Sequence, residues 1–448
     1  MRTFYLTLLS LFTATAISGQ GILDEYIREG LQSNSGLKQS KLQFEASLEA
    51  LNEARGGLLP SIDFSSRYTK AHGGRAVEFP LGDMINPVYS SLNGLLGEEQ
   101  FPQIENQSFN FNRTTDIDNK LSLTQPIFDK RLSYQKEIAE GQSQMYQVDV
   151  AIEKRRLISE IKKAYFNYQK TKQLVELFDS TKVLVKENLR VSEVLFNNHK
   201  VTEDVVLRAQ SEIGKVDLQI AEANKMRNTA RAYFNFLLNR PLEQEIVQEE
   251  VREIPTLPAV LPTAIQNREE FTKIDYGLNT NESEQKLYES RNLPNIYAVA
   301  DYGFQGSEYE FSSESDYALA SLVLSWNLFS GFQNKAKKQQ ALLKRELLNS
   351  QREQLSDNIQ LEAIQSFYDL REKTQSFVTT GQIADEAGKV YSLVNKKYRE
   401  GIASQLDLID ARTNFTNSKI QNIISKYDTW ISHAEYERIT ASYLIENL

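Results

Sequence analysis

Two carboxylates stand three residues apart just after a single glycine in the segment KYREGIASQLDLIDAR, residues 397–412. On a helix, Asp407 and Asp410 would share one face. Gly401 suits a left-handed cap that ends one helix, and Ser404 suits the N-cap of the next. Ser404 and Asp407 also have capping-box spacing, in which each side chain binds the other residue's backbone N–H. Asp407 therefore has a structural role available to it, whereas Asp410 has no such local duty and could be a solvated acid.

Other residue types that carry out chemistry are absent or scattered. There is no cysteine, so a thiol nucleophile, a thiolate metal site and a disulfide framework are excluded. His72, His199 and His433 fall in different segments without a second ligand at metal-binding spacing. Neither a nucleophile elbow nor a phosphate-cradling glycine loop is recognisable. The sequence predicts no enzyme activity, no metal site and no cofactor.

The N-terminal segment MRTFYLTLLSLFTATAISGQ predicts export. Its single arginine, apolar run and small residues are typical of a signal peptide, assigned here to residues 1–19. The net charge of -9, from 60 acidic and 51 basic residues, opposes a nucleic-acid partner. No later segment reaches the roughly 18 consecutive apolar residues of a membrane helix. Any insertion into a membrane would have to use strands.

Proline positions divide the chain into elements, because proline removes a helical hydrogen bond and clashes with the preceding turn. Two long stretches, 127–240 and 295–448, contain no proline and are rich in good helix formers. They predict two helices of on the order of 100 Å, each followed by a returning helix. Helices of this length need partners along their whole length, and composition alone also allows a coiled-coil rod.

The chain is internally duplicated. LSLTQPIFDKR (121–131) precedes the first long helix as LVLSWNLFSGF (322–332) precedes the second, and LLPSIDF (58–64) matches NLPNIYA (292–298). HKVTEDVVLRAQ (199–210) matches GIASQLDLIDAR (401–412). We assign residues 20–240 to a first repeat, 241–270 to a connector and 271–448 to a second repeat. Between its two strands the first repeat carries a long loop, residues 73–108, where the second has a short one.

The predicted strands are two-faced. In YALASLVLSWNLF (317–329) one face is uniformly apolar and the other is smaller and more polar. Alternation of this kind suits a transmembrane barrel with lipid outside and water inside, and it equally suits a soluble sheet with one buried face. Four strands per chain cannot close a barrel, so the membrane interpretation requires oligomerisation.

The chain resembles the TolC family of outer-membrane efflux proteins in three features. These are the signal peptide, the duplicated strand pair with its long helical hairpin, and the opening segment LDEYIREGLQSNSGLKQSKLQFEASLEALNEARGGLLPSI (23–62). The resemblance implies a mainly α fold with a small β part. It implies a homotrimer in which the strands form a twelve-stranded transmembrane β-barrel and the helices a periplasmic α-helical tunnel. Residues 241–270 would be the equatorial connector around that tunnel, with a solvated linker as the alternative for 243–262.

The function implied by the resemblance is a passive exit duct, without enzymatic activity, for efflux or type I secretion. Its location would be the outer membrane, in contact with outer-membrane lipid and extending into the periplasm. The implied partners are a periplasmic adaptor protein and an inner-membrane transporter of RND or ABC type. The alternative from a different class is a periplasmic or secreted coiled-coil scaffold protein.

The resemblance also implies roles for the turns between the long helices and their returning helices. They would be periplasmic tips that dock the adaptor. The second tip matches the family pattern closely and consists of Gly401, Ile402, Ala403, Ser404, Gln405 and Leu406. The first tip matches it less well and consists of His199, Lys200, Val201, Thr202, Glu203 and Asp204.

Asp407 and Asp410 match the two positions of an inward-facing aspartate ring found in some family members. Threefold symmetry would gather six carboxylates at a narrow entrance, where they would attract and bind cations. Capping remains the competing explanation for Asp407, and a solvated surface is the competing explanation for Asp410. The first-repeat equivalents are Val205 and Arg208, so the ring would come from the second repeat alone.

Overall fold

The computed structural model describes residues 21–110, 113–249, 254–258, 267–309 and 311–443. The expected signal peptide, residues 1–19, lies outside the described residues. The chain divides into two compact units. One comprises the chain up to Leu48, Gly141–Asn279 and the chain from Arg345; the other comprises Glu49–Glu140 and Thr280–Lys344. The two units are treated separately below.

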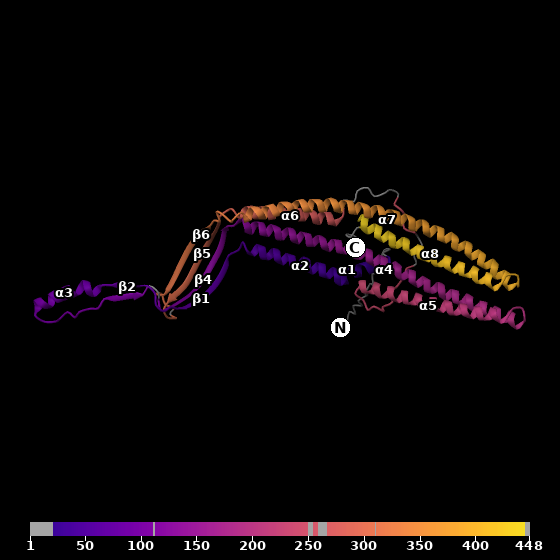
Figure 1. Ribbon diagram of the computed structural model, residues 1–448, viewed down its shortest axis with the longest axis horizontal. Helices are drawn as coiled ribbons and strands as arrows, with labels where there is room; N and C mark the ends of the chain where they lie inside the picture. The colour runs from indigo at the N-terminus through magenta and orange to yellow at the C-terminus, as the bar shows by residue number, and fades with distance from the viewer. Residues whose placement is uncertain (1–20, 111–112, 250–253, 259–266, 310, 444–448) are drawn as a thin grey trace, which may run out of the picture. The chain divides into compact units, whose positions relative to one another are not determined.

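The second of these units contains an antiparallel sheet of four strands in the order β1-β4-β5-β6 (Figure 1). The strands are β1 (Ser61–Lys70), β4 (Thr115–Phe128), β5 (Asn295–Gly306) and β6 (Asp316–Ser325). Phe64 pairs with Leu121, Leu121 with Tyr302, and Tyr302 with Ala318. One register position along, Asp63 pairs with Ser122 and Ser122 with Asp301. Apolar and polar side chains thus fall on opposite faces, as the alternation predicted.

The last strand is shorter than the sequence pattern suggested. We expected alternation to continue through residue 329, but the ladder ends where Asn295 pairs with Ser325. Its partner β5 begins directly after Pro294, which has no N–H to donate. The indole of Trp326 instead donates to the carbonyl oxygen of Asn292 at 2.9 Å. The prediction that Trp326 and Leu328 belong to the strand was therefore wrong.

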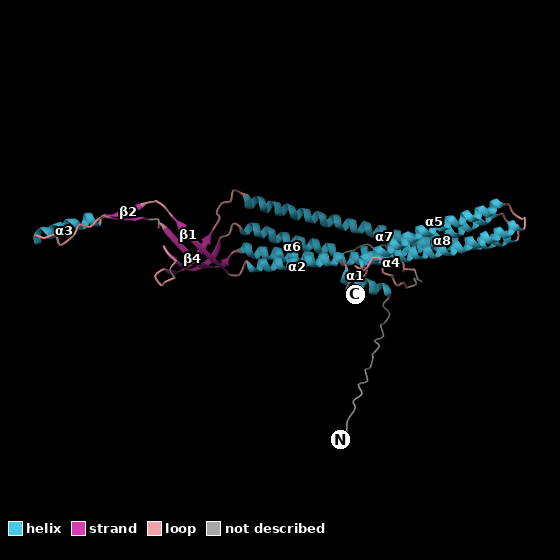
Figure 2. Ribbon diagram, turned by 90° about the horizontal axis from the view of Figure 1, so that it is seen from below, coloured by secondary structure: helices cyan, strands magenta, loops and turns pink. Residues whose placement is uncertain are grey.

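The long loop of the first repeat contains regular structure. Strand β2 (Ala76–Phe79) pairs with β3 (Gln107–Asn110), and helix α3 (Leu81–Leu96) lies between them. Figure 2 shows α3 running beside the chain that returns from it. The sequence predicted a loop here, and α3 forms although it contains Pro87, which removes a helical hydrogen bond and clashes with the preceding turn. Asn86 and Asn93 offset this penalty, because each side-chain amide donates to a carbonyl of the returning chain and accepts from an N–H of the same residue.

The long helices predicted from the proline-free stretches are confirmed. They are α4 (Lys130–Asn197, 68 residues) and α7 (Gln333–Arg399, 67 residues). Helices α5 (Glu203–Leu237) and α8 (Gln405–Thr440) return from them, and the shorter helices are α1 (Ile22–Ser33), α2 (Ser35–Gly56) and α6 (Glu269–Ser290). In the first unit α4, α5, α7 and α8 lie side by side (Figure 1). None of the helices in the described ranges is apolar over a stretch long enough to cross a membrane.

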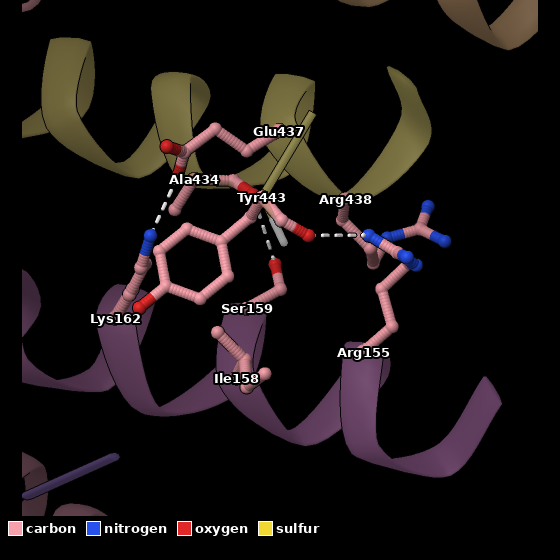
Figure 3. Close-up of a pocket in the computed structure, with 8 residues that line it drawn as sticks. All are labelled: Arg155, Ile158, Ser159, Lys162, Ala434, Glu437, Arg438 and Tyr443. Carbon is pink, nitrogen blue, oxygen red and sulfur yellow. Dashed lines mark hydrogen bonds and ion pairs between the residues drawn. The ribbon is translucent and has the colours of Figure 1, made fainter. Parts of the chain in front are cut away.

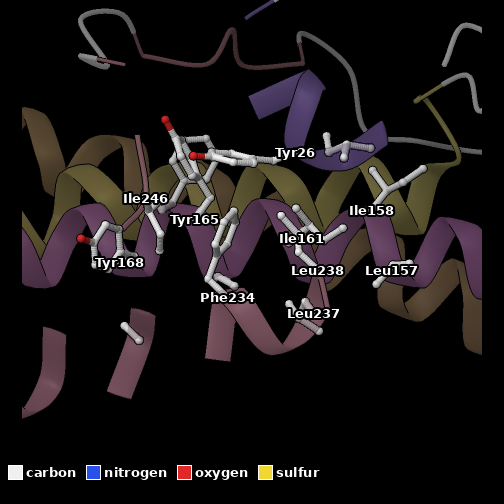
Figure 4. Packing of buried hydrophobic residues seen from close by; sticks show 14 of the residues in the cluster. Tyr26, Leu157, Ile158, Ile161, Tyr165, Tyr168, Phe234, Leu237, Leu238 and Ile246 are labelled. Carbon is white, nitrogen blue, oxygen red and sulfur yellow. The ribbon is translucent and has the colours of Figure 1, made fainter. Parts of the chain in front are cut away.

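An aromatic cluster forms the core of the first unit (Figure 4). The ring of Tyr26 packs edge-on against Phe234 at a centroid distance of 5.1 Å, and Tyr165 contacts both. The start of the connector is bound to this core. The Val247 N–H donates to the Tyr26 hydroxyl at 2.9 Å, and the Glu249 N–H to the Tyr165 hydroxyl at 3.1 Å. These bonds join the connector to the core at two points, although most of its side chains between Glu243 and Glu249 are exposed. Residues 250–253 and 259–266 lie outside the described residues, and the choice between an equatorial connector and a solvated linker stays a prediction.

A small pocket lies between α4 and the end of the chain from α8 to Tyr443 (Figure 3). Side chains of α4 bind residues of that end. The Nζ atom of Lys162 lies 3.7 Å from the centre of the Tyr443 ring and 2.7 Å from a carboxylate oxygen of Glu437. Arg155 donates to the Tyr443 carbonyl oxygen at 3.1 Å and also binds Glu269. Burial and nearby carboxylates raise the pKa of Tyr443 to about 12. These charged side chains bind one another, so we assign this pocket a structural role.

Candidate functional site at the hairpin tips

Both hairpin tips use the same backbone turn. Gly401 has a φ of +78°, its N–H donates to the Tyr398 carbonyl, and the next N–H donates to the Lys397 carbonyl at 2.8 Å. His199 has a φ of +54° and makes the equivalent bonds, to Phe196 at 2.8 Å and from the next N–H to Leu195 at 2.9 Å. These are the paired bonds of a Schellman cap. The left-handed cap predicted at Gly401 is confirmed, and a histidine adopts it in the other repeat.

The two returning helices begin differently. The Asp407 N–H donates to the Ser404 hydroxyl at 3.1 Å, and the Ser404 N–H donates to an Asp407 carboxylate oxygen at 3.0 Å. The capping box predicted for α8 is therefore present. The hydrogen bonds from the Ser404 side chain and backbone lower the pKa of Asp407. The capping explanation for this carboxylate accordingly has direct support.

In the first repeat, the N-cap of α5 lacks these bonds. Thr202 occupies the N-cap position, but its side chain makes no capping hydrogen bond to the helix. Its hydroxyl instead donates to the carboxylate of Asp204, which also forms an ion pair of 3.4 Å with Arg208. The tip of the first repeat thus has the same turn and a weaker helix start.

The two tips are tied to each other. The side-chain amide of Gln405 donates to the carbonyl oxygen of Val205 at 2.6 Å. About two turns further from the tips, Arg412 on α8 binds Glu212 on α5, and both side chains are largely buried. Across α4 and α7 the hydroxyls of Ser192 and Tyr398 are 3.1 Å apart. The structure therefore brings the two predicted groups of tip residues into one site.

The sequence reasoning missed Glu212 and Arg412. Burial opposes ionisation of the Glu212 carboxyl, but hydrogen bonds from Lys215 and Arg412 outweigh it and lower its pKa. In the sequence these are two of many charged residues on long helices, and their partners lie far apart in the chain. Without the arrangement of helices, no spacing signal distinguishes them.

Most of the predicted tip residues are exposed. Ala403, Gln405 and Val201 are half-buried, and the rest lie at the surface: Gly401, Ile402, Ser404, Leu406, His199, Lys200, Thr202, Glu203 and Asp204. Among them Ile402 is 71% exposed and Leu406 is 58% exposed. Two exposed aliphatic side chains at a tight turn form a surface that a protein partner could cover.

Asp407 and Asp410 are both exposed on α8. The side chain of Asp410 makes no hydrogen bond or ion pair within the described part of the chain. Its carboxylate is thus available to ions, whereas that of Asp407 is partly engaged by Ser404. Nor do three acidic or histidine side chains gather into a metal-binding group anywhere within the described ranges.

Comparison with known proteins identifies the family. The family model described as outer membrane efflux protein matches residues 26–240 and 260–439. Three solved structures are similar to this chain. The outer-membrane channel OprN has 16% sequence identity and a TM-score of 0.74, and the match covers 94% of this chain and 90% of that one. The Campylobacter jejuni outer membrane channel CmeC has 15% identity and a TM-score of 0.75, with 94% of this chain and 85% of that one covered, and the Neisseria gonorrhoeae outer membrane channel MtrE has 16% identity and a TM-score of 0.70, with 93% and 88% covered. No curated protein matches the chain.

The fold and the geometry of the tips show a chain with two repeats, each made of a pair of strands and a long helical hairpin. The chain belongs to the outer membrane efflux protein family, because the family model matches most of its length. It is accordingly an outer-membrane efflux channel protein, and its family is one of ducts rather than of enzymes. The coiled-coil scaffold alternative receives no support from these comparisons.

Replacing the N-cap of α8 should destabilise the second tip more than the equivalent change in the first. We expect Ser404→Ala to lower the free energy of unfolding by about 1 kcal/mol, the usual contribution of such a cap. Thr202→Ala is the matched control and should cost much less, because Thr202 makes no capping bond. Denaturant unfolding measures both, and equal losses would contradict the assignment.

The effect of Ser404→Ala should also depend on pH. A lowered Asp407 pKa contributes stability that is present above the unfolded value, about 3.9, and is lost as pH falls through the folded value. The difference between the wild type and Ser404→Ala should therefore shrink in acid.

Breaking the buried ion pair of Arg412 and Glu212 should lower the free energy of unfolding more than breaking the exposed pair of Lys215 and Glu212. We expect Arg412→Met to cost about 3 kcal/mol of unfolding free energy, since removing one partner of a buried pair is strongly destabilising. Lys215 binds the same carboxylate at 2.7 Å, but its side chain is 68% exposed. Lys215→Met should cost no more than about 1 kcal/mol. Calorimetry of both variants tests the difference, and similar losses would show that Arg412 does not anchor the tips.

Proposed function

We propose that three copies of this chain form a passive exit duct through the outer membrane, without enzymatic activity. The observation that carries the proposal is the two-faced, four-stranded sheet in a chain of the outer membrane efflux protein family. Each copy would contribute its four strands to a twelve-stranded barrel. Its helical hairpins would contribute to a tunnel that extends into the periplasm.

The apolar face of the sheet is exposed in the single chain. Phe64 is 69% exposed, Leu322 is 76% exposed and Leu324 is 62% exposed. Such a face is unstable in water and stable against lipid chains, because burial of apolar surface is favourable. The outer-membrane assignment of the family makes lipid the natural cover.

The opposite face is polar and internally bonded. Asp301 accepts from the Ser122 hydroxyl at 2.5 Å and from Lys120 at 3.2 Å. The Tyr317 hydroxyl donates to Asp118 at 2.9 Å. These groups suit a water-filled interior, where charged side chains stay hydrated.

The sheet edges support the trimer. Among the described residues β1 and β6 are the two end strands of the sheet, so each has one edge without a strand partner. Within lipid, unpaired backbone N–H and carbonyl groups cost several kcal/mol each. Pairing β6 of one copy with β1 of the next satisfies both edges, and three copies close the ring.

The tips support a role in assembly. Ile402 and Leu406 are exposed, and the hydrogen bond from Gln405 to Val205 joins their tip to the other one. We assign this surface to the docking of a periplasmic adaptor, which would connect the duct to an inner-membrane transporter of RND or ABC type. The described part of the connector would belong to the equatorial region of the tunnel.

Purified protein inserted into a planar lipid bilayer should conduct ions. We expect discrete, stable conductance steps, because a water-filled duct of fixed diameter opens as a unit. The control is the same protein after heat denaturation. Absence of conductance from a correctly folded, detergent-stable protein would contradict the proposal.

We further propose that Asp407 and Asp410 form the entrance ring. Replacing both by Ala should weaken the block of the ion current by multivalent cations in bilayer recordings, because the ring of three chains loses six carboxylates. Asp410→Asn alone is the cleaner variant, since Asp407 also caps its helix. The matched control is Glu203→Ala with Asp204→Ala at the other tip, which should leave block unchanged. Unaltered block in both aspartate variants would assign these residues to the helix surface alone.

A further inference from the structure

An arm projects from the hairpin between β1 and β4. We define the arm as residues 71–110, comprising β2, α3, β3 and the chain between them. It lies beyond the end of the sheet in Figure 1 and belongs to the same unit as the strands. The matching turn of the second repeat, between β5 and β6, is short. The arm is thus a feature of one repeat that the duct itself does not explain.

The polar side of α3 is bound by the arm's own chain. Asn86 exchanges two hydrogen bonds of 2.9 Å with the backbone of Ile104. Asn93 exchanges two with the backbone of Phe101, at 2.8 and 3.0 Å. At Gly82 the returning chain approaches so closely that a Cβ atom would lie 2.5 Å from the Ile104 carbonyl oxygen. The polar face of this helix is therefore its inner face.

The opposite side of α3 is apolar and faces outward. Its side chains recur at helical spacing and form what we call the stripe: Met84 (65% exposed), Val88 (56%), Leu92 (37%), Leu95 (84%) and Leu96 (55%). The paired strands continue this character with exposed Val77, Phe79 and Phe109. A water-exposed helix normally has the reverse arrangement, with its apolar side inward. An outward stripe of this size marks a surface that another molecule covers.

The charges of the arm argue against an anionic lipid surface as that cover. The arm contains a single arginine, Arg75, and no lysine, whereas its acidic residues are Glu78, Asp83, Glu98, Glu99 and Glu105. Helices that lie on membranes instead carry Lys and Arg on a free polar face. Here the polar face is occupied by the returning chain.

The same charges permit contact between identical stripes. The stripe itself contains no charged side chain. Glu78 falls between Val77 and Phe79 in β2 and so points to the opposite face of that strand. The Asp83 carboxylate accepts from the Asn106 amide at 3.0 Å. The stripe positions therefore bring no carboxylate into the contact, and Glu98 and Glu99 follow in the chain after the end of α3.

We propose that the stripe of each arm docks against the stripe of a second copy of this chain, so that the arms pack together beyond the barrel. The inference rests on the proposed trimer, which places three arms at one end of the barrel at high effective concentration. Gly73 and Gly74, with φ of +75° and +125°, form the joint through which each arm leaves β1. Glycine has no Cβ atom, so both positions accept these backbone angles without a steric penalty.

The absence of cysteine allows a direct test in the full-length protein. Met84→Cys, Val88→Cys and Leu95→Cys are prepared as separate variants, with Ser90→Cys as the matched control on the inner side of α3, where Ser90 accepts from Gln103 at 3.0 Å. The purified proteins are oxidised in detergent with copper phenanthroline and separated on non-reducing gels. We expect at least one stripe variant to form several-fold more disulfide-linked dimer than Ser90→Cys.

Light scattering of each variant before oxidation separates failure of this inference from failure of the proposed function. Intact trimers in which no stripe variant forms more dimer than the control would overturn the docking of arms while leaving the duct in place. Monomers before oxidation would overturn the proposed trimer, and the arm contact with it. As a further test, the stripe cysteines are labelled with a fluorophore and the protein is placed in nanodiscs that contain brominated lipid. Quenching of the fluorescence would show that lipid covers the stripe and would also overturn the inference.

Discussion

The backbone groups along the free edges of β1 and β6 set the condition on which the rest of the structure depends. A sheet with one exposed apolar face is stable in lipid, but its edge groups would then lack hydrogen-bond partners. One chain supplies four strands to this sheet, too few to close on themselves. Pairing with identical copies would satisfy the edges, so the sheet requires an oligomer in lipid, and we propose that this oligomer is a trimer. The long helices have the same need, since helices such as α4 are stable only when packed along their length.

Duplication has produced two hairpins with one backbone and different side chains. His199 adopts the left-handed turn that Gly401 adopts in the other repeat. Of the two returning helices, α8 begins with a complete capping box and α5 does not. Helix α8 also carries carboxylates at the two candidate entrance positions, where α5 has Val205 and Arg208. The bonds from Gln405 to Val205 and from Arg412 to Glu212 hold the dissimilar tips together. The two hairpins therefore differ in side chains at their tips, where we propose that partners and ions bind.

Local patterns in the sequence predicted much of this fold. Helix length followed from the absence of proline, and strand faces from alternation, because both depend on neighbouring residues alone. The predictions failed where distant residues decide the outcome. Helix α3 forms despite Pro87 because Asn86 and Asn93 bind the returning chain, and β6 ends at Ser325 because its partner begins at Asn295. The pair of Glu212 and Arg412 was missed for the same reason.

Electron cryo-microscopy of the purified protein in detergent tests the central claim most directly. The account predicts particles with threefold symmetry, in which β6 of each copy pairs with β1 of its neighbour and a continuous lumen runs through sheet and helices. Single chains, or oligomers in which these strand edges remain unpaired, would contradict it.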